Sequence, residues 1–306
     1  MTDILIIGAG PAGLTAAIYA LRAGLSVTLL EASVYGGQMS ITSDIENYPG
    51  FKCIKGHELS ELMHRQVVDM GGEFVFQEAK SVELCGKFKT VKTSQSEYHS
   101  RAVIVANGLK RRVLACRGEK EYTGKGVSYC ATCDGAFFKG KNVLVIGGGN
   151  TAVEDAIYLS NLCNKVTLVV RKDYLRAEKY LCDIADKKNN ITKLMESRVK
   201  EIKGENTVKS AVIEDKNGKF TEVLTDGIFI AIGYSPDNEI YRGQIEMDKD
   251  MYFISNESCT TNISGVFVAG DCRIKPLRQI TTATSDGAIA GSMAIRFISE
   301  SDSKTN

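Results

Sequence analysis

Two cysteines separated by two residues form the part of this chain that could do redox chemistry. Cys130 and Cys133 enclose Ala131 and Thr132, and Asp134 follows directly. Cysteines at this spacing can close into a disulfide with little movement of the backbone. At the start of a helix the same spacing lowers the pKa of one thiol, which makes a thiolate available for exchange with another disulfide. The pattern therefore predicts a redox-active disulfide.

The alternatives for this pair are a zinc site and an inert buried dithiol. A structural zinc site needs four ligands, and the other seven cysteines and the three histidines offer no matching pair, so no metal is expected. The sequence leaves two roles open for Asp134. It could protonate a departing thiolate if burial raises its pKa, or it could be an ordinary helix cap or first-turn acid.

A glycine-rich turn lies between an apolar strand and a helix near the N-terminus. Gly8, Gly10 and Gly13 have GxGxxG spacing, and a second apolar strand, Val27–Leu30, follows. The first glycine permits the turn, the second lets a pyrophosphate approach the backbone, and the third lets helix and strand pack closely. The helix N-terminus offers unpaired N–H groups to the phosphates. These features predict a dinucleotide site.

Residues 143–171 repeat this unit without a gap. Gly147, Gly149 and Ala152 take the positions of the three glycines, again between an apolar strand and a helix. One such turn is a weak signal, whereas two in register, each correctly placed, predict two dinucleotide sites.

The end of the second strand distinguishes the two units. In the first unit Glu31 can accept hydrogen bonds from an adenosine ribose and repel a 2′-phosphate. In the second unit the aligned residue is Val170, followed by Arg171 and Lys172, with Arg176 one turn later. Guanidinium groups pair with phosphate dianions through charge-assisted bonds; the alternative is a solvated charged loop. We predict FAD at the first site and NADP(H), rather than NAD(H), at the second.

The segment Gly265–Asp271 is a third apolar strand that ends in Gly270 and Asp271, whose carboxylate could bind ribitol hydroxyls. If it contacts the same flavin as Glu31, the flavin domain is discontinuous. The sequence thus predicts an α/β fold with two Rossmann-like dinucleotide-binding domains, the second inserted into a discontinuous first. We expect the FAD-binding domain at 1–113 and 246–306, the NADPH-binding domain with the CxxC pair at 114–245, and a last helix at Ser285–Ile298.

Composition is consistent with this organisation. A chain of 306 residues with 43% apolar and 25% charged residues fits a globular protein of two domains. A formal net charge of +1 gives no sign of a nucleic-acid or membrane surface. No stretch approaches the ~20 apolar residues of a membrane span, and the first apolar run is too short for a secretory signal. We expect a cytoplasmic protein without nucleic-acid or membrane partners.

Several motifs together resemble the low-molecular-weight thioredoxin reductases over essentially the whole chain. They are CATCD before GGGNTA, GGQ followed by ENYPG, and GVFVAGD followed by RQ. The resemblance implies a homodimer with FAD and NADPH that reduces thioredoxin or a thioredoxin-like protein. It also implies that Cys133 faces the flavin, that Cys130 attacks thioredoxin and that Asp134 is the general acid.

The residues expected at each cofactor combine the glycine turns with these motifs. Those expected around FAD are Gly8, Gly10, Pro11, Ala12, Gly13, Glu31, Gly36, Gly37, Gln38, Asn47, Gly270, Asp271, Arg278, Gln279 and Ile280. Those expected around NADPH are Gly147, Gly149, Asn150, Thr151, Ala152, Arg171, Lys172 and Arg176.

Other functions fit the sequence less well. A related flavoprotein could take electrons from reduced ferredoxin or reduce another small disulfide protein, but relatives that use ferredoxin typically lose the nicotinamide motif, which is intact here. A flavoprotein that reduces a quinone or ferredoxin would not need the CxxC pair. A non-enzymatic redox sensor would leave both dinucleotide motifs unexplained.

Overall fold

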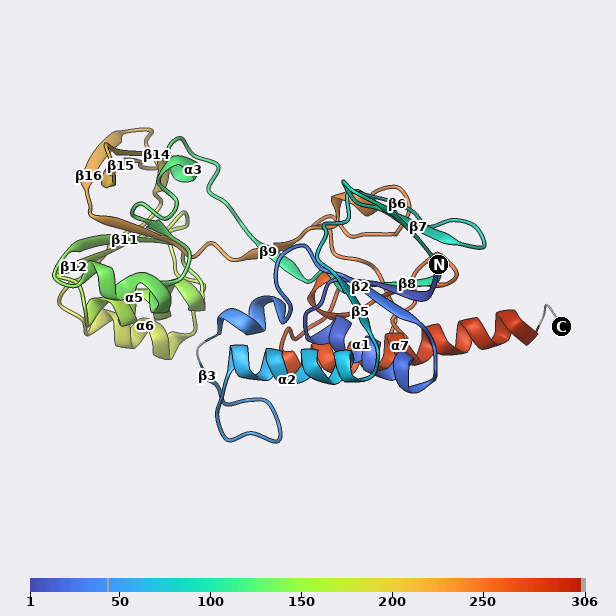
Figure 1. Ribbon diagram of the computed structural model, residues 1–306. Helices are drawn as coiled ribbons and strands as arrows, with labels where there is room; N and C mark the ends of the chain where they lie inside the picture. The colour runs from blue at the N-terminus through green and yellow to red at the C-terminus, as the bar shows by residue number, and fades with distance from the viewer. Residues whose placement is uncertain (43, 304–306) are drawn as a thin grey trace. The chain divides into compact units, whose positions relative to one another are not determined.

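The computed structural model describes residues 1–42 and 44–303, and the chain divides into two compact units (Figure 1). Unit 1 consists of Met1–Lys110 and Ser235–Asn306, and unit 2 of Arg111–Tyr234. The predicted α/β architecture, with one unit inserted into a discontinuous other, is confirmed.

The second boundary between the units lies earlier than the predicted 245/246. Residues 235–245 belong to unit 1 because Tyr241 and Ile245 are buried against Phe253 in its core. The Tyr241 and Phe253 rings meet edge to face with centroids 5.3 Å apart. The chain crosses between the units in β9 (Leu109–Arg111) and β18 (Tyr234–Pro236), two strands that pair with each other.

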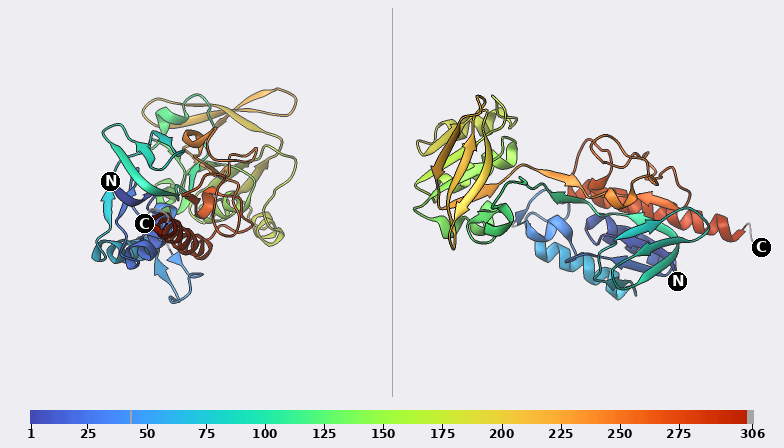
Figure 2. Two further views of the ribbon diagram at one scale, coloured as in Figure 1. Left: turned by 90° about the vertical axis from the view of Figure 1, so that its right-hand side faces the viewer. Right: turned by 90° about the horizontal axis from the view of Figure 1, so that it is seen from above.

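Unit 1 is built on a sheet whose two faces are buried by different partners. Its order is β5-β2-β1-β8-β7-β6, with β19 also paired to β8. Along β1, Ile4 and Ile6 face the helices, whereas Leu5 and Ile7 face the opposite core, as the alternation of a strand requires. Helices α1, α2 and α7 lie on the first face (Figures 1 and 2). The strands are β1 (Thr2–Ile7), β2 (Val27–Leu30), β3 (Asp44–Ile45), β4 (Ile54–Lys55), β5 (Glu73–Val75), β6 (Ser81–Glu83), β7 (Lys89–Lys92), β8 (Glu97–Val105) and β19 (Val266–Val268), and the helices are α1 (Pro11–Arg22), α2 (Gly56–Asp69) and α7 (Ile280–Ser303).

Unit 2 repeats this layered design. A parallel sheet of order β10-β17-β11-β12-β13 has α5 and α6 on one face and the antiparallel sheet β14-β15-β16 on the other. Val143 and Val145 of β11 face the helices, and Leu144 and Ile146 face the antiparallel sheet. The strands are β10 (Val127–Ser128), β11 (Asn142–Ile146), β12 (Lys165–Val169), β13 (Ile191–Leu194), β14 (Arg198–Gly204), β15 (Val208–Glu214), β16 (Phe220–Leu224) and β17 (Gly227–Ile230), and the helices are α3 (Glu119–Tyr122), α4 (Ala131–Asp134), α5 (Asn150–Ser160) and α6 (Lys179–Asp186).

Helix α7 is longer at both ends than the predicted Ser285–Ile298. It packs along α1, where Gly287 and Gly291 allow close approach: a Cβ on Gly287 would lie 2.2 Å from the carbonyl oxygen of Ala12. Neither α7 nor any other helix within the described ranges has the length and apolarity to cross a bilayer. The same residues contain no group of three or more His, Cys, Asp or Glu side chains that could hold a metal ion.

A buried ion cluster on α7 fixes the loop that carries Asp271. The Asp286 carboxylate accepts hydrogen bonds from the Gly270 N–H (2.9 Å), from Nε and Nη2 of Arg273 (both 2.8 Å) and from the Lys275 Nζ (2.7 Å). Burial raises the pKa of Asp286, but the bonds from Arg273 and Lys275 outweigh it and hold the pKa below its usual value. The ionised carboxylate therefore stabilises the fold above the pKa of the unfolded chain, and this contribution is lost as the pH falls through the lowered pKa.

Replacing Asp286 with Asn should destabilise the protein strongly, because two buried cations lose their counter-ion. Breaking a buried ion pair from one side costs about 3–5 kcal/mol of unfolding free energy. Urea unfolding followed by circular dichroism should show this loss near neutral pH, and a smaller one only once the pH has fallen through the lowered native pKa of Asp286, where the native carboxylate is protonated.

The matched control is Glu239→Gln, which removes an exposed partner of Arg242 in the same unit. It should change the unfolding midpoint little. Equal effects of Asp286→Asn and Glu239→Gln would show that the buried cluster does not stabilise unit 1.

Candidate active site

The CxxC pair forms a disulfide in unit 2, as the spacing predicts. The Cys130 and Cys133 sulfurs are bonded at 2.09 Å, with their Cα atoms 5.3 Å apart. Cys130 is the N-cap of α4, and its Sγ accepts a hydrogen bond from the Cys133 N–H at 3.2 Å. This N–H can stabilise a thiolate on Cys130 once the disulfide is reduced.

Asp134 is joined to the disulfide segment through a buried hydroxyl. Ser128, at the end of β10, donates from Oγ to Asp134 Oδ2 at 2.6 Å and accepts the Cys130 N–H at 3.0 Å. Asp134 lies in the first turn of α4, but its carboxylate makes no capping bond to the helix that follows. Sequence reasoning missed Ser128, for which the only signal is a hydroxyl two residues before Cys130.

The first glycine turn leaves its central position open. A Cβ on Gly8, whose φ is +103°, would lie 2.4 Å from the Ala106 carbonyl oxygen, and one on Gly13 would lie 1.9 Å from that of Gly8. A Cβ on Gly10 would meet no protein atom within 4 Å. The outer glycines thus serve packing, whereas Gly10 borders space that a pyrophosphate could fill. Pro11 and Ala12 follow as the first residues of α1.

Glu31 lies directly beside this turn, because β2 and β1 are paired. Its Oε2 accepts the Ala9 N–H and its Oε1 accepts the Ser33 N–H, both at 2.9 Å. The carboxylate is therefore fixed at the carboxyl end of the strand, where a ribose would be bound.

Asp271 carries an unsatisfied buried oxygen, which marks a ligand position in unit 1. Its Oδ1 is buried and has no hydrogen-bond partner within the described residues, and burial raises its pKa. Such atoms normally find a partner, and a flavin ribitol hydroxyl would provide one. Arg278 lies next to it, with Nε bonded to the Asp271 carbonyl oxygen at 3.2 Å and the guanidinium 4.3 Å from the Tyr252 ring centroid.

The remaining residues expected at FAD belong to the same unit. Gln38 Nε2 donates to the Leu109 carbonyl oxygen at 3.1 Å, and Asn47 Nδ2 donates to Gln279 Oε1 at 3.0 Å across a long sequence separation. The Gly36 N–H bonds the Ala9 carbonyl oxygen at 2.7 Å, which brings the 36–38 segment to the first glycine turn. Gly37 is also adjacent, since a Cβ on it would lie 3.5 Å from the Gly10 Cα, and Ile280 begins α7.

The second glycine turn has the same geometry as the first. A Cβ on Gly147 would lie 2.2 Å from the Ala231 carbonyl oxygen, whereas one on Gly149 would meet nothing within 4 Å. Asn150 begins α5 and exchanges hydrogen bonds with Glu178, accepting the Glu178 N–H at 2.9 Å. Thr151 and Ala152 follow in the first turn of α5.

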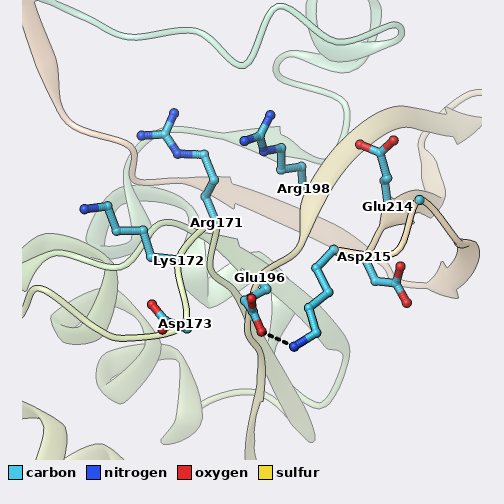
Figure 3. Close-up of a pocket in the computed structure, with 9 residues that line it drawn as sticks. Arg171, Lys172, Asp173, Glu196, Arg198, Glu214 and Asp215 are labelled. Carbon is cyan, nitrogen blue, oxygen red and sulfur yellow. Dashed lines mark hydrogen bonds and ion pairs between the residues drawn. The ribbon is translucent and has the colours of Figure 1, made fainter.

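A charged pocket of about 510 Å³ lies beyond the end of β12 (Figure 3). Two of the three predicted phosphate-binding residues, Arg171 and Lys172, line it, whereas Arg176 is not in its lining and bonds the Gly148 carbonyl oxygen through its backbone N–H at 2.6 Å. Arg198 was not predicted because it lies on a different element, β14. The lining residues are Arg171, Lys172, Asp173, Glu196, Arg198, Glu214, Asp215, Lys216 and Gly218.

Comparison with known proteins agrees with this geometry. The family model described as pyridine nucleotide-disulphide oxidoreductase matches residues 2–287. The chain is 44% identical over 304 residues to a thioredoxin reductase of Peptoclostridium acidaminophilum, covering 97% of this chain and 96% of the relative. It is 44% identical over 300 residues to one of Bacillus subtilis, covering 97% and 95%. A thioredoxin reductase structure from Lactococcus lactis superposes with a TM-score of 0.87 at 42% identity, covering 98% of this chain and all of that one. The chain belongs to the pyridine nucleotide-disulphide oxidoreductase family.

Membership of this family implies a flavin and a nicotinamide cofactor. The open glycine positions and the unpaired Asp271 oxygen of this disulphide oxidoreductase fit such groups, because each provides space or an acceptor that the protein itself leaves unused.

A further carboxyl group of this disulphide oxidoreductase has an unusual pKa. It belongs to Asp155 on α5, the helix that follows the second glycine turn. Burial and the nearby charge of Glu154 raise its pKa to about 7, and Arg111 opposes the shift only in part. No hydrogen bond or ion pair to its carboxylate occurs within residues 1–42 and 44–303. The folded protein thus holds the proton more tightly than the unfolded chain, so stability falls as the pH rises from the unfolded pKa to the folded one.

Exchanging Asp155 for Asn should remove this pH-dependent penalty. The variant should match the wild type near pH 4 and become more stable than it with rising pH, by at most about 4 kcal/mol above pH ~7. Denaturant unfolding across this pH range measures the difference. Asp183→Asn serves as the control, because Asp183 is an exposed acid on α6. A difference in unfolding free energy between Asp155→Asn and the wild type that does not change with pH would contradict the role given to the ionisation of Asp155.

Proposed function

We propose that this protein is an NADPH-dependent thioredoxin-disulfide reductase with FAD as its flavin. The observation that carries the proposal is the Cys130–Cys133 disulfide, held at the start of α4 with a carboxylate and a buried hydroxyl beside it. The relatives named thioredoxin reductase, which match nearly the whole chain, support thioredoxin or a thioredoxin-like protein as the substrate.

Unit 1 is proposed to bind FAD. The flavin would supply an acceptor for the hydride of NADPH and a two-electron donor for the disulfide. The Gly8–Gly13 turn and the N-terminus of α1 would hold the pyrophosphate, Glu31 the adenosine ribose and Asp271 the ribitol chain. Arg278, which lies beside Asp271, would add a positive charge near that chain.

Unit 2 is proposed to bind NADPH in its own glycine turn. The open position at Gly149 would accept the pyrophosphate, and Arg171 and Lys172 would pair with the 2′-phosphate. Val170 at the end of the strand offers no carboxylate to repel that phosphate, in contrast to Glu31 of unit 1.

Exchange with thioredoxin follows from the positions of the two sulfurs and the acid. In the reduced protein the Cys130 thiolate attacks the thioredoxin disulfide, whose S–S bond breaks as a mixed disulfide forms. Asp134 protonates the departing thioredoxin thiolate. Cys133 then attacks Cys130 in the mixed disulfide, which releases the second thioredoxin thiol and restores the Cys130–Cys133 bond. Two electrons pass to thioredoxin in each cycle.

The wider setting is proposed from the family resemblance. Residues 1–110 and 235–306 form the FAD-binding domain and residues 111–234 the NADPH-binding domain, and the protein acts as a cytoplasmic homodimer.

Anaerobic addition of NADPH to the FAD-containing protein should bleach the flavin absorbance and release two titratable thiols. Cys133→Ser should keep flavin reduction by NADPH and lose thioredoxin reduction, because the internal disulfide can no longer form. If reduced ferredoxin bleaches the flavin and NADPH does not, NADPH is not the electron donor and that part of the proposal is wrong. Full thioredoxin reduction by Cys133→Ser would overturn the exchange mechanism.

Removing the Ser128 hydroxyl should slow thiol exchange without affecting flavin reduction. Ser128→Ala deletes the bond that orients Asp134, and the loss of one such bond corresponds to about a tenfold lower rate. Stopped-flow kinetics can measure the two half-reactions separately, and Ser128→Thr should restore much of the exchange rate because it keeps the hydroxyl.

The matched control for Ser128 is Ser160→Ala. Ser160 is another buried serine of unit 2, and its hydroxyl donates to the Ile157 carbonyl oxygen within its own helix. Equal rates in both variants, or equal losses in both half-reactions, would refute a positioning role for Ser128.

A further inference from the structure

Arg198 reaches the rim of the charged pocket from an element outside the duplicated unit. The backbone joins the two segments: the Glu196 N–H bonds the Lys172 carbonyl oxygen at 3.0 Å, and the Ser197 N–H bonds that of Val170 at 2.9 Å. These bonds bring the start of β14 beside the end of β12. Figure 3 shows the Arg171 and Arg198 side chains extending in the same direction along one side of the pocket.

The two guanidinium groups on this side have no carboxylate partner among the residues that the structure describes. Within the part of the chain that the structure describes, neither the Arg171 nor the Arg198 side chain makes an ion pair or a hydrogen bond. Lys172 bonds the Tyr174 hydroxyl at 2.7 Å, lies 4.8 Å from the centroid of that ring and makes no ion pair among the described residues, so its charge stays uncompensated by a carboxylate there. This side of the pocket therefore carries positive charge available to an anion.

Two of the four acidic groups that line the pocket are already compensated by other cations. Glu196 pairs with Lys216 at 2.8 Å, and Glu214 pairs with Lys200 at 3.0 Å.

The remaining two carboxylates do not compensate the arginines. Asp215 accepts backbone N–H groups in its own turn, from Asn217 at 2.8 Å and from Lys219 at 3.0 Å. Asp173 makes no ion pair within residues 1–42 and 44–303, and Figure 3 shows it on the side of the pocket away from the guanidinium ends of Arg171 and Arg198. The acids therefore leave both arginines free for an anion.

We propose that Arg198 determines coenzyme specificity by pairing, together with Arg171, with the 2′-phosphate of NADPH. A planar guanidinium can hold two phosphate oxygens at once, and two such groups that line the same pocket fit a phosphate dianion. This inference rests on the proposed function, because it assumes that the second glycine turn binds NADPH.

Binding of two adenosine nucleotides to the FAD-containing protein tests Arg198 without turnover. The probes are adenosine 2′,5′-bisphosphate, which carries the 2′-phosphate, and 5′-AMP, which lacks it. In calorimetry Arg198→Gln should weaken binding of the bisphosphate about tenfold or more, because a charge-assisted contact is lost. Its affinity for 5′-AMP should be unchanged. The affinity of Arg198→Lys for the bisphosphate should lie between those of the wild type and Arg198→Gln, since lysine keeps the positive charge but lacks the planar, two-pronged guanidinium.

The control is Arg117→Gln, which removes the same charge from unit 2 at an exposed side chain paired with Glu201 outside the pocket. It should bind both nucleotides as the wild type does. Three results would overturn the role of Arg198: an unchanged bisphosphate affinity in Arg198→Gln, equal losses for both nucleotides, or an equal loss in Arg117→Gln.

The nucleotide preference of the wild-type protein distinguishes a failure of the proposed role of Arg198 from a failure of NADPH as the proposed donor. If it binds the bisphosphate no better than 5′-AMP, the choice of NADPH fails and the role of Arg198 fails with it. If it prefers the bisphosphate and Arg198→Gln keeps that preference, NADPH stands and only Arg198 is excluded.

Discussion

The disulfide between Cys130 and Cys133 constrains the whole arrangement, because it must accept electrons at one moment and pass them to another protein at the next. Both sulfurs belong to unit 2, together with the second glycine turn, whereas Glu31 and Asp271 belong to unit 1. In the proposed mechanism one unit therefore carries both the nicotinamide and the disulfide, and both must reach a flavin held by the other. Two crossings of the chain, in β9 and β18, connect the units and give unit 2 no other covalent link to unit 1.

The two glycine turns show how one local design can serve two nucleotides. In each, the first glycine lies against a carbonyl oxygen of a neighbouring strand, and the middle glycine faces open space. The difference arises one strand later. Glu31 is fixed by two backbone N–H groups and presents negative charge, whereas Val170 presents none and leaves selection to the residues that follow. Backbone geometry thus provides phosphate binding, and side chains at the strand end provide discrimination.

The sequence alone predicted those features that depend on short-range spacing. The disulfide, both glycine turns and the inserted arrangement were found, since each is encoded within a few residues or by repetition. Residues 241–245 join the compact unit 1 through the burial of Tyr241 and Ile245 against Phe253, a long-range contact that no periodicity reveals. Arg198 and Ser128 were missed for the same reason, because their positions follow from strand pairing and loop bonds rather than from a motif.

Groups left without partners mark the proposed ligand positions in both units. Asp286, deep in unit 1, is saturated by Arg273, Lys275 and a backbone N–H, and it holds the loop on which the neighbouring Asp271 keeps one buried oxygen unpaired. In unit 2 two of the four acids of the charged pocket are ion-paired, while the exposed Arg198 side chain makes no ion pair among the described residues; the buried unsatisfied atom is that of Asp271. A fold satisfies its buried polar groups wherever it can, so an unsatisfied one beside a saturated network is maintained at a cost in stability. That cost is offset when a ligand supplies the missing partner, which couples cofactor binding to the stability of the loop that receives it.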